Sequence, residues 1–257
     1  MNSTPKAPAS QVRKARRVAF KPVNEGTRPA DAIQAQIRSL IGTHKLKAGD
    51  RLPSERVLSE QFAVSRNSVR QAIRSLADSG LLEVRKGASG GAFIRDGGGD
   101  AVRAGLADLY SLGAIQPMHL IEARLLIGVE VVRLACERGT DEQIEQLASN
   151  VQQAERAVEA GNVRQRTMVN LEFYRILARM THNPLLEIIT DAVMTMTLRF
   201  VEEFMRTSDA TVMPFRRKLL AELRERDSQA ASARMQKHLL ELQKIYLAEV
   251  AARAESS

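Results

Sequence analysis

The sequence comprises 257 residues, of which 44% are hydrophobic, and it carries a formal net charge of +8 at pH 7. This length allows two domains with separate cores, and a single cysteine excludes a disulfide within the chain. The chain has neither an apolar run long enough to span a membrane nor the apolar core of a signal peptide. We therefore expect a cytoplasmic protein that does not associate with membranes.

The positive charge is concentrated at one end of the chain. Residues 1–100 contain 18 Lys and Arg against 9 Asp and Glu, whereas the remaining residues carry a net charge of −1. This asymmetry predicts a polyanionic partner for the N-terminal part, bound in a salt-dependent way.

The first segment, residues 1–27, is polar and rich in Pro, Ser, Lys and Arg. It is predicted to be a disordered basic tail. The tail could add contacts to phosphate groups as a flexible arm, although a passive tail explains the composition as well. A helix is expected next, over residues 31–43, where Ile33, Ile37, Leu40 and Ile41 recur at helical spacing.

A pair of short helices follows. Ser54 can cap a helix over residues 55–62, and Ser65 can cap a second helix from Arg66 to about Ser79, separated from the first by a tight connection. The polar residues around the start and outer face of the second helix are Arg66, Asn67, Ser68, Arg70, Gln71 and Arg74. Such residues are typical of a recognition helix, because arginine suits the major-groove edge of guanine and asparagine that of adenine.

A small β-hairpin is predicted directly after these helices. Gly80 can end the second helix in the left-handed conformation. Residues 81–85 and 92–95 are the strand candidates, and the segment Lys86 to Gly91 between them is basic and glycine-rich. A hairpin tip of this kind beside two helices can lie against phosphate or enter the minor groove. Residues 28–97 are thus predicted to form a winged helix-turn-helix domain.

The remaining chain is predicted to be all-helical. Three glycines, Gly97 to Gly99, mark a linker, and no convincing strand pattern occurs after Ala101. Seven amphipathic stretches are expected over residues 101–112, 118–138, 141–160, 163–181, 184–204, 214–226 and 227–254. Short connections between them predict an antiparallel bundle over residues 101–254. Cys136 lies in an apolar context and is expected to be a packed core thiol.

The N-terminal motifs resemble the GntR family of bacterial transcription regulators. The resemblance covers roughly residues 29–96 and is carried by Leu52-Pro53-Ser54-Glu55-Arg56, Val64-Ser65-Arg66, Val69-Arg70, Gly80-Leu81 and Gly87. It implies that Arg56, Arg66 and Arg70 contact bases or nearby phosphates, joined by Asn67 and Ser68, and that Lys86 and Gly87 reach the minor groove. Asn67 departs from the threonine or proline of most relatives, so the operator sequence is expected to differ too.

The C-terminal half resembles the all-helical FCD-type effector domain of the FadR subfamily. The signatures are Glu122-Ala123-Arg124, Asn183-Pro184-Leu185-Leu186 and His238-Leu239 with their flanking residues. Many members of this subfamily bind a divalent metal through one aspartate and three histidines inside the bundle. The matching positions here are Asn170, Tyr174, Arg216 and His238, with Phe215 or Arg217 as alternatives for Arg216.

These departures predict that the pocket holds no metal and needs no cofactor. An asparagine, a tyrosine and an arginine do not replace an aspartate and two histidines as ligands, and a permanent cation repels a metal ion. The polar cluster that remains is expected to bind an effector through Arg124, Asn170, Tyr174, Arg216 and His238. Arginine favours a carboxylate or a phosphate. A purely structural polar network is the alternative.

The sequence therefore predicts a mainly α-helical, homodimeric transcription regulator. Its partners are a palindromic double-stranded operator and a small organic acid or an acyl-CoA, and binding of that effector would release the DNA. A regulator with a metal-containing pocket and an architectural DNA-binding protein without an effector are the alternatives. An enzyme is not expected, because no nucleophile–base pair, phosphate loop or carboxylate pair is present.

Overall fold

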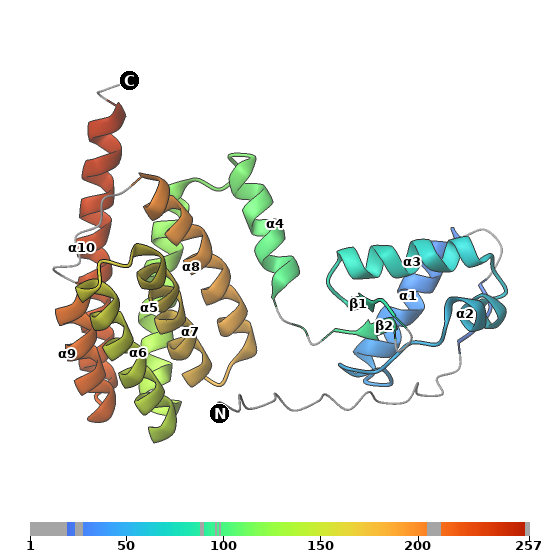
Figure 1. The fold of residues 1–257 in the computed structure, drawn as a ribbon, viewed down its shortest axis with the longest axis horizontal. Coiled ribbons are helices and arrows are strands. Elements are labelled where there is room, and N and C mark those ends of the chain that lie inside the picture. Colours follow the sequence, from blue (N-terminus) through green and yellow to red (C-terminus); the bar gives the residue numbers. More distant parts are fainter. Residues whose placement is uncertain are drawn as a thin grey trace, which may run out of the picture. The chain divides into compact units, whose positions relative to one another are not determined.

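The computed structural model describes residues 20–23, 28–87, 90–95, 97, 99–204 and 212–254. The chain divides into two compact units, one ending at Ala101 and the other beginning at Val102. Figure 1 shows that helices dominate both units. Within the residues just given, no helix is both long and apolar enough to cross a membrane.

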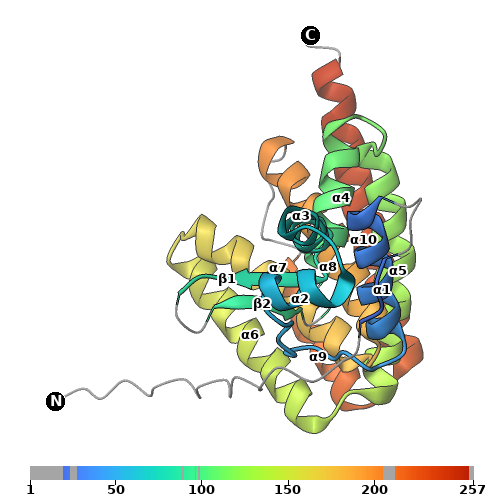
Figure 2. The same ribbon diagram turned by 90° about the vertical axis from the view of Figure 1, so that its right-hand side faces the viewer.

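The N-terminal unit has the elements of a winged helix-turn-helix domain. In chain order these are α1 (Pro29–Gly42), α2 (Glu55–Phe62), α3 (Arg66–Asp78), β1 (Leu82–Arg85) and β2 (Gly91–Ile94). The strands pair antiparallel, with Leu82 opposite Ile94 and Arg85 opposite Gly91. Figure 2 shows them side by side as a hairpin. The predicted fold class is thereby confirmed for this unit.

Two serine caps and one left-handed residue fix the angle between α2 and α3. The Ser54 side chain accepts from the amide of Val57, and the Ser65 side chain accepts from the amide of Ser68 at 3.1 Å. Between the helices, Ala63 adopts a φ of 54°, which allows the chain to turn within three residues. These caps satisfy amides that a helix leaves free at its start, as the sequence predicts.

The disordered tail predicted over residues 1–27 extends too far along the chain. Phe20 is only 8% exposed and its ring lies 4.9 Å from that of Phe62, while the Val23 amide donates to the Phe62 carbonyl at 3.0 Å. Residues 20–23 therefore belong to the winged domain. The polar composition of residues 1–27 led to the prediction of disorder, although one aromatic residue of this segment, Phe20, packs on the core. The rest of the predicted tail, residues 1–19 and 24–27, lies outside the described residues.

The C-terminal unit is a helical bundle, as predicted. Its helices are α4 (Asp100–Ser111), α5 (Pro117–Arg138), α6 (Asp141–Glu159), α7 (Val163–Met180), α8 (Pro184–Phe204), α9 (Val212–Arg224) and α10 (Ser228–Ala254). Helix α5 is central, because it packs against α7, α8, α9 and α10. Cys136 on α5 is fully buried, which confirms its predicted place in the core.

Helix α4 differs from the other six helices of this unit because none of its residues is buried. An ion pair from Arg103 on α4 to Asp191 on α8 attaches it to the bundle. Asp191 is 8% exposed and also accepts from Nε of Arg175 on α7 at 2.5 Å. One carboxylate thus serves two arginines from two other helices.

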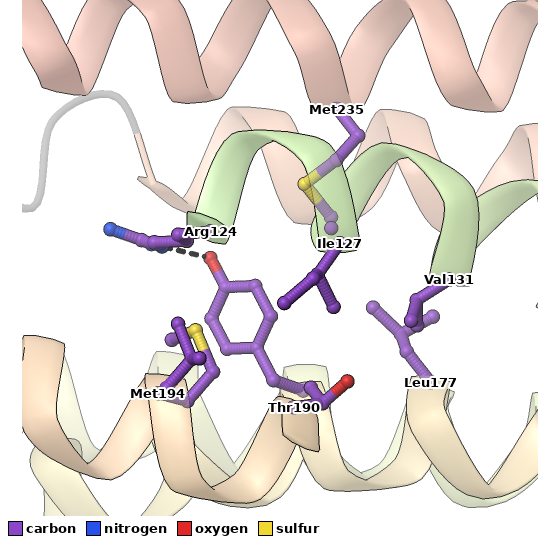
Figure 3. Close-up of a pocket in the computed structure, with 10 residues that line it drawn as sticks. Arg124, Ile127, Val131, Leu177, Thr190, Met194 and Met235 are labelled. Atoms are coloured by element: carbon purple, nitrogen blue, oxygen red, sulfur yellow. Dashed lines mark hydrogen bonds between the residues drawn. The ribbon is translucent and has the colours of Figure 1, made fainter. Parts of the chain in front are cut away.

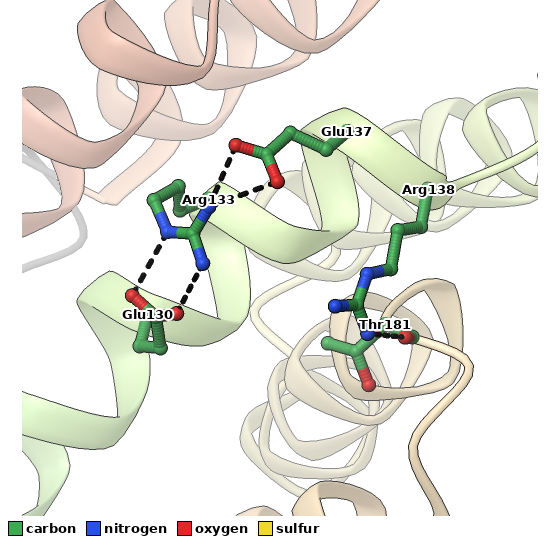
Figure 4. A network of polar contacts seen from close by, with 5 residues as sticks. All are labelled: Glu130, Arg133, Glu137, Arg138 and Thr181. Atoms are coloured by element: carbon green, nitrogen blue, oxygen red, sulfur yellow. Dashed lines mark hydrogen bonds and ion pairs between the residues drawn. The ribbon is translucent and has the colours of Figure 1, made fainter.

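A second ion-pair network lies on the exposed surface of α5. The Arg133 guanidinium donates to Glu130 on one side and to Glu137 on the other, one helical turn away in each direction (Figure 4). Nearby, Arg138 donates to the Thr181 carbonyl at 3.1 Å and so satisfies the end of α7. Exposed pairs of this kind contribute little to stability because water and salt screen them.

The contrast between the two networks gives a testable prediction. Asp191→Asn removes a nearly buried charge that both Arg103 and Arg175 contact, so it should lower the free energy of unfolding by roughly 1–3 kcal/mol. Glu130→Gln removes a carboxylate from the exposed network and should cost less than about 1 kcal/mol. Urea unfolding followed by circular dichroism measures both, and equal losses would contradict a structural role for Asp191.

Candidate functional sites

The outer face of α3 offers polar groups to a ligand along its length. Asn67, Arg70, Gln71 and Arg74 are exposed and line a shallow surface hollow that continues to the end of the helix. Arg66 is exposed at the first position of α3. Each of these five side chains can donate at least two hydrogen bonds toward a base edge or a phosphate. The geometry therefore suits insertion of α3 into a major groove.

Ser68 faces its own helix start. Its hydroxyl lies 2.9 Å from the hydroxyl of Ser65, and the side chain is half-buried. Ser68 thus belongs to the cap that begins α3, whereas Arg66 and Asn67, which are also predicted to contact DNA, are exposed.

Two of the predicted DNA-contacting arginines form ion pairs. Arg70 pairs with Glu55 on α2, with Nη2 and Oε2 2.8 Å apart. Arg56 pairs with Glu60 one turn along α2, at 2.7 Å. Both pairs are exposed, so their arginines stay within reach of a partner outside the protein.

The wing tip is exposed and locally constrained. Lys86 and Gly87 are both exposed, and Gly87 adopts a φ of 104°, which few other residues tolerate. Its carbonyl accepts from the Gly90 amide at 2.9 Å, and Arg51 donates to the Gly90 carbonyl. Ala88 and Ser89, also expected at the tip, lie outside the described residues.

The five predicted effector residues line one cavity of the helical bundle. Its volume is about 70 Å³, and it lies among α5, α7, α8, α9 and α10. The predicted residues that line it are Arg124, Asn170, Tyr174, Arg216 and His238. Arg166, Thr197 and Tyr246 also line it, although the sequence did not predict them. Tyr246 could have been predicted from the sequence, because His238, Leu242 and Tyr246 follow one another at intervals of four residues and so lie on one face of α10.

Arg124 lines the cavity from α5 and is 8% exposed. Its Nη2 donates to the Tyr174 hydroxyl at 2.9 Å and its Nη1 to the Tyr246 hydroxyl at 3.4 Å. Its Nε, also buried, has no hydrogen-bond partner among the described residues. Both described partners are neutral, so the guanidinium charge is not compensated by either of them.

Arg216 enters the cavity from α9 and is 2% exposed. It donates to the side-chain oxygen of Asn170, and its guanidinium lies 4.4 Å from the centre of the Phe173 ring. The aromatic face stabilises a cation at this distance. Arg216 therefore has an aromatic and an amide contact that hold it on the wall of the cavity.

His238 completes the wall from α10. Its ring stacks on Phe215, with centroids 3.8 Å apart and planes 8° from parallel. Burial, followed by the charges of Arg124 and Arg216, lowers the pKa of His238 to about 3. The ring is consequently neutral at pH 7 and offers one donor and one acceptor.

The donor chemistry of this cavity does not fit a divalent metal ion. The described lining residues include one imidazole and no carboxylate, and two arginines stand beside that imidazole. Elsewhere in the described part of the chain, no three His, Cys, Asp or Glu side chains form a group suited to a metal. Guanidinium groups attract anions and repel metal ions.

A second pocket of about 10 Å³ adjoins the polar cavity. Arg124, Tyr174 and Met194 line both spaces. The second one is otherwise mainly apolar, and Figure 3 shows Ile127, Met194 and Met235 around it. Arg124 and Tyr174 thus stand between a polar space and an apolar one.

A winged helix-turn-helix unit joined to a helical unit with a polar cavity defines a class of transcription regulators that combine DNA binding with a sensor domain. Residues 29–93 match the family model described as bacterial regulatory proteins, gntR family, and residues 119–241 match the FCD domain. The chain therefore belongs to the GntR family and carries an FCD domain. Its assignment to the FadR subfamily stays a prediction.

Individual relatives agree with this assignment. The Uxu operon transcriptional regulator of Escherichia coli (strain K12) is 30% identical over 167 residues, which cover 65% of this chain and 64% of that regulator. The HTH-type transcriptional repressor NanR of Enterobacter sp. (strain 638) is 29% identical, over 61% of this chain and 60% of NanR. Each match thus spans less than two thirds of the relative. Both relatives are named as transcription regulators.

One solved structure is similar over most of the chain. The structure of Streptococcus agalactiae GntR has a TM-score of 0.68 and 25% sequence identity, and the match covers 84% of this chain and 99% of that one. This similarity supports the order of a winged unit followed by a helical unit.

The lowered pKa of His238 gives a prediction for pH dependence. The unfolded chain binds a proton at this site near pH 6.5, whereas the folded chain does so only near pH 3. Between these values the unfolded state holds more protons, so stability falls as the pH falls, by about 2 kcal/mol from pH 7 to pH 5. His238→Phe keeps a ring on Phe215 and should remove this part of the pH dependence. Identical pH profiles of unfolding for both proteins would contradict a buried neutral imidazole.

Proposed function

We propose that this chain is a sequence-specific transcriptional repressor that an acidic small molecule releases from its operator. The observation that carries the effector part of the proposal is the buried guanidinium of Arg124, whose described partners are two neutral hydroxyls. A buried charge is costly unless an opposite charge compensates it. An anionic ligand would supply that charge at the time of binding.

The size and lining of the cavity favour a compact carboxylic acid over an acyl-CoA. A volume of about 70 Å³ suits a small acid, whereas most of a coenzyme A thioester would have to lie outside the cavity. Nε of Arg124 supplies one unused donor toward a carboxylate. Asn170, His238 and Tyr246 supply neutral polar groups that suit hydroxyl or carbonyl oxygens elsewhere on such an acid.

The DNA part of the proposal is supported by α3 and by the net charge of residues 1–100. Arg66, Asn67 and Arg70 would contact base edges, and Arg56 would contact a base or a nearby phosphate. Lys86 and Gly87 at the wing tip would reach the minor groove. A homodimer would place two such units on a two-fold symmetric operator, since most oligomers of this kind are symmetric dimers.

Helix α7, which lines part of the cavity, also takes part in the bridge to α4, the pair of arginine contacts made by Asp191. Tyr174 faces Arg124, and the next residue, Arg175, binds Asp191, which also binds Arg103 on α4. A ligand that draws Arg124 away from Tyr174 would therefore change the packing of α7 beside this bridge. In the proposed mechanism, ligand binding favours an arrangement of the winged units with lower operator affinity.

The DNA contact is tested by substitution of Arg66. If Arg66 reads a guanine, Arg66→Ala should weaken operator binding by roughly 1–3 kcal/mol and relax the preference at one base pair. Fluorescence anisotropy on an operator and its single-base variants, at constant salt, measures both effects. Weaker binding with unchanged preference would assign Arg66 to a phosphate instead.

The effector site is tested by substitution of Arg124. Purified protein is screened for thermal stabilisation by a panel of small carboxylic acids and CoA thioesters, together with a measurement of its metal content. We expect one class of acid to raise the melting temperature of the wild-type protein. Arg124→Met should abolish this shift, while Arg133→Met, a change on the exposed face of α5, should keep it.

Three other results would overturn the effector proposal. Bound metal at one ion per chain would support the metal-containing pocket. Stabilisation by no acid, combined with little sequence preference for DNA, would support an architectural protein. An equal shift in Arg124→Met would place the acid elsewhere in the protein.

A further inference from the structure

The Arg70–Glu55 ion pair has a specific geometry. Nε of Arg70 lies 3.3 and 3.2 Å from the two carboxylate oxygens of Glu55, and Nη2 lies 2.8 Å from Oε2. The carboxylate therefore occupies the side edge of the planar guanidinium, where the Nε and Nη2 hydrogens point in the same direction. The two residues come from different helices, since Glu55 begins α2 and Arg70 lies one turn into α3.

This geometry leaves one edge of the guanidinium available. With the side edge held by Glu55, the end edge still presents one hydrogen on Nη1 and one on Nη2, parallel to each other. That fork matches the O6 and N7 acceptors of guanine in the major groove. The Arg70 side chain is 52% exposed, so this edge can reach a partner outside the protein.

We propose that Glu55 is a specificity-determining residue, which holds Arg70 in the orientation that reads a guanine. The inference rests on the proposed operator binding by α3. Glu55 acts as a positioning residue: it fixes the side chain of Arg70 between α2 and α3 and keeps it from turning to a phosphate. A long arginine that is already held in place loses less freedom when it binds a base.

The alternative is that Glu55 is simply an acidic residue at a helix start. A carboxylate near the DNA-binding face repels phosphates, so its removal should then strengthen binding to every sequence equally. The positioning role predicts a different pattern, because discrimination at one base pair should be lost while binding to unrelated DNA becomes stronger. These two effects have opposite signs, which makes the roles separable.

Asp78 provides a matched control. It is the last residue of α3, is exposed, and borders the same surface hollow as Arg70. Asp78→Asn removes one negative charge from this face, as Glu55→Gln does. Bases are read by the beginning of a recognition helix, so this change is expected to leave base discrimination intact.

The experiment uses the full-length protein and double-stranded DNA. The wild-type protein first selects its preferred sequence from random duplexes. Dissociation constants are then measured for that sequence, its single-base variants and an unrelated duplex, at one salt concentration. The proteins compared are the wild type, Arg70→Ala, Glu55→Ala, Glu55→Gln, Asp78→Asn and the double variant Arg70→Ala with Glu55→Ala, each checked for an unchanged circular dichroism spectrum.

Arg70→Ala should lose roughly tenfold or more of its discrimination at one G·C pair. Glu55→Ala should lose discrimination at the same pair, and the double variant should lose no more than Arg70→Ala alone. Asp78→Asn should bind unrelated DNA more tightly and keep its discrimination.

Retained discrimination in Glu55→Ala at the pair that depends on Arg70 would overturn the inference and leave operator binding intact. The inference would also be overturned if Glu55→Ala lost discrimination at a different base pair, or if Arg70→Ala lost discrimination at no particular base pair. A wild-type protein that selects no sequence at all would instead overturn the proposed function, and the inference with it.

Discussion

The helical unit is built around the burial of a permanent positive charge. Arg124 lies on α5, the helix that packs against four others, and only 8% of this residue is exposed. The hydroxyls of Tyr174 and Tyr246 draw α7 and α10 toward α5 through this one group. The neutral state of His238 follows from its own burial and then from this constraint, because a third cation beside Arg124 and Arg216 would be still more costly.

The two candidate sites use arginine in different ways because their surroundings differ. Arg56 and Arg70 are exposed and paired with glutamates, where water screens the charges of the pair and the guanidinium stays within reach of a nucleic-acid acceptor. Arg124 is buried and contacts neutral hydroxyls, where an arriving anion meets no competing charge from those two partners. An exposed arginine that is paired with a glutamate is therefore suited to being oriented toward DNA. A buried arginine that contacts only hydroxyls among its described partners is suited to binding an anion.

The sequence predicted the elements better than it predicted the contacts. The serine caps at Ser54 and Ser65 are local signals, and they place α2 and α3 correctly. Phe20 was missed because its partner, Phe62, is distant in sequence and polar residues surround it. The Arg70–Glu55 pair was missed for a similar reason: the angle between two helices decides which side chains meet. The cavity residues came from a family resemblance, and periodicity alone would not have joined Arg124 to Tyr246.

The position of Asp191 links these observations to the proposed response. A carboxylate that serves arginines from α4 and α7 joins α4 to the bundle by charge, and no residue of α4 is fully buried. Ion pairs to one carboxylate can be altered by a small movement more easily than a buried hydrophobic face can. Tyr174 precedes Arg175 on α7, so the cavity and the bridge share one rigid helix. A change in the contacts of Arg124 therefore has a short and physically continuous route to α4.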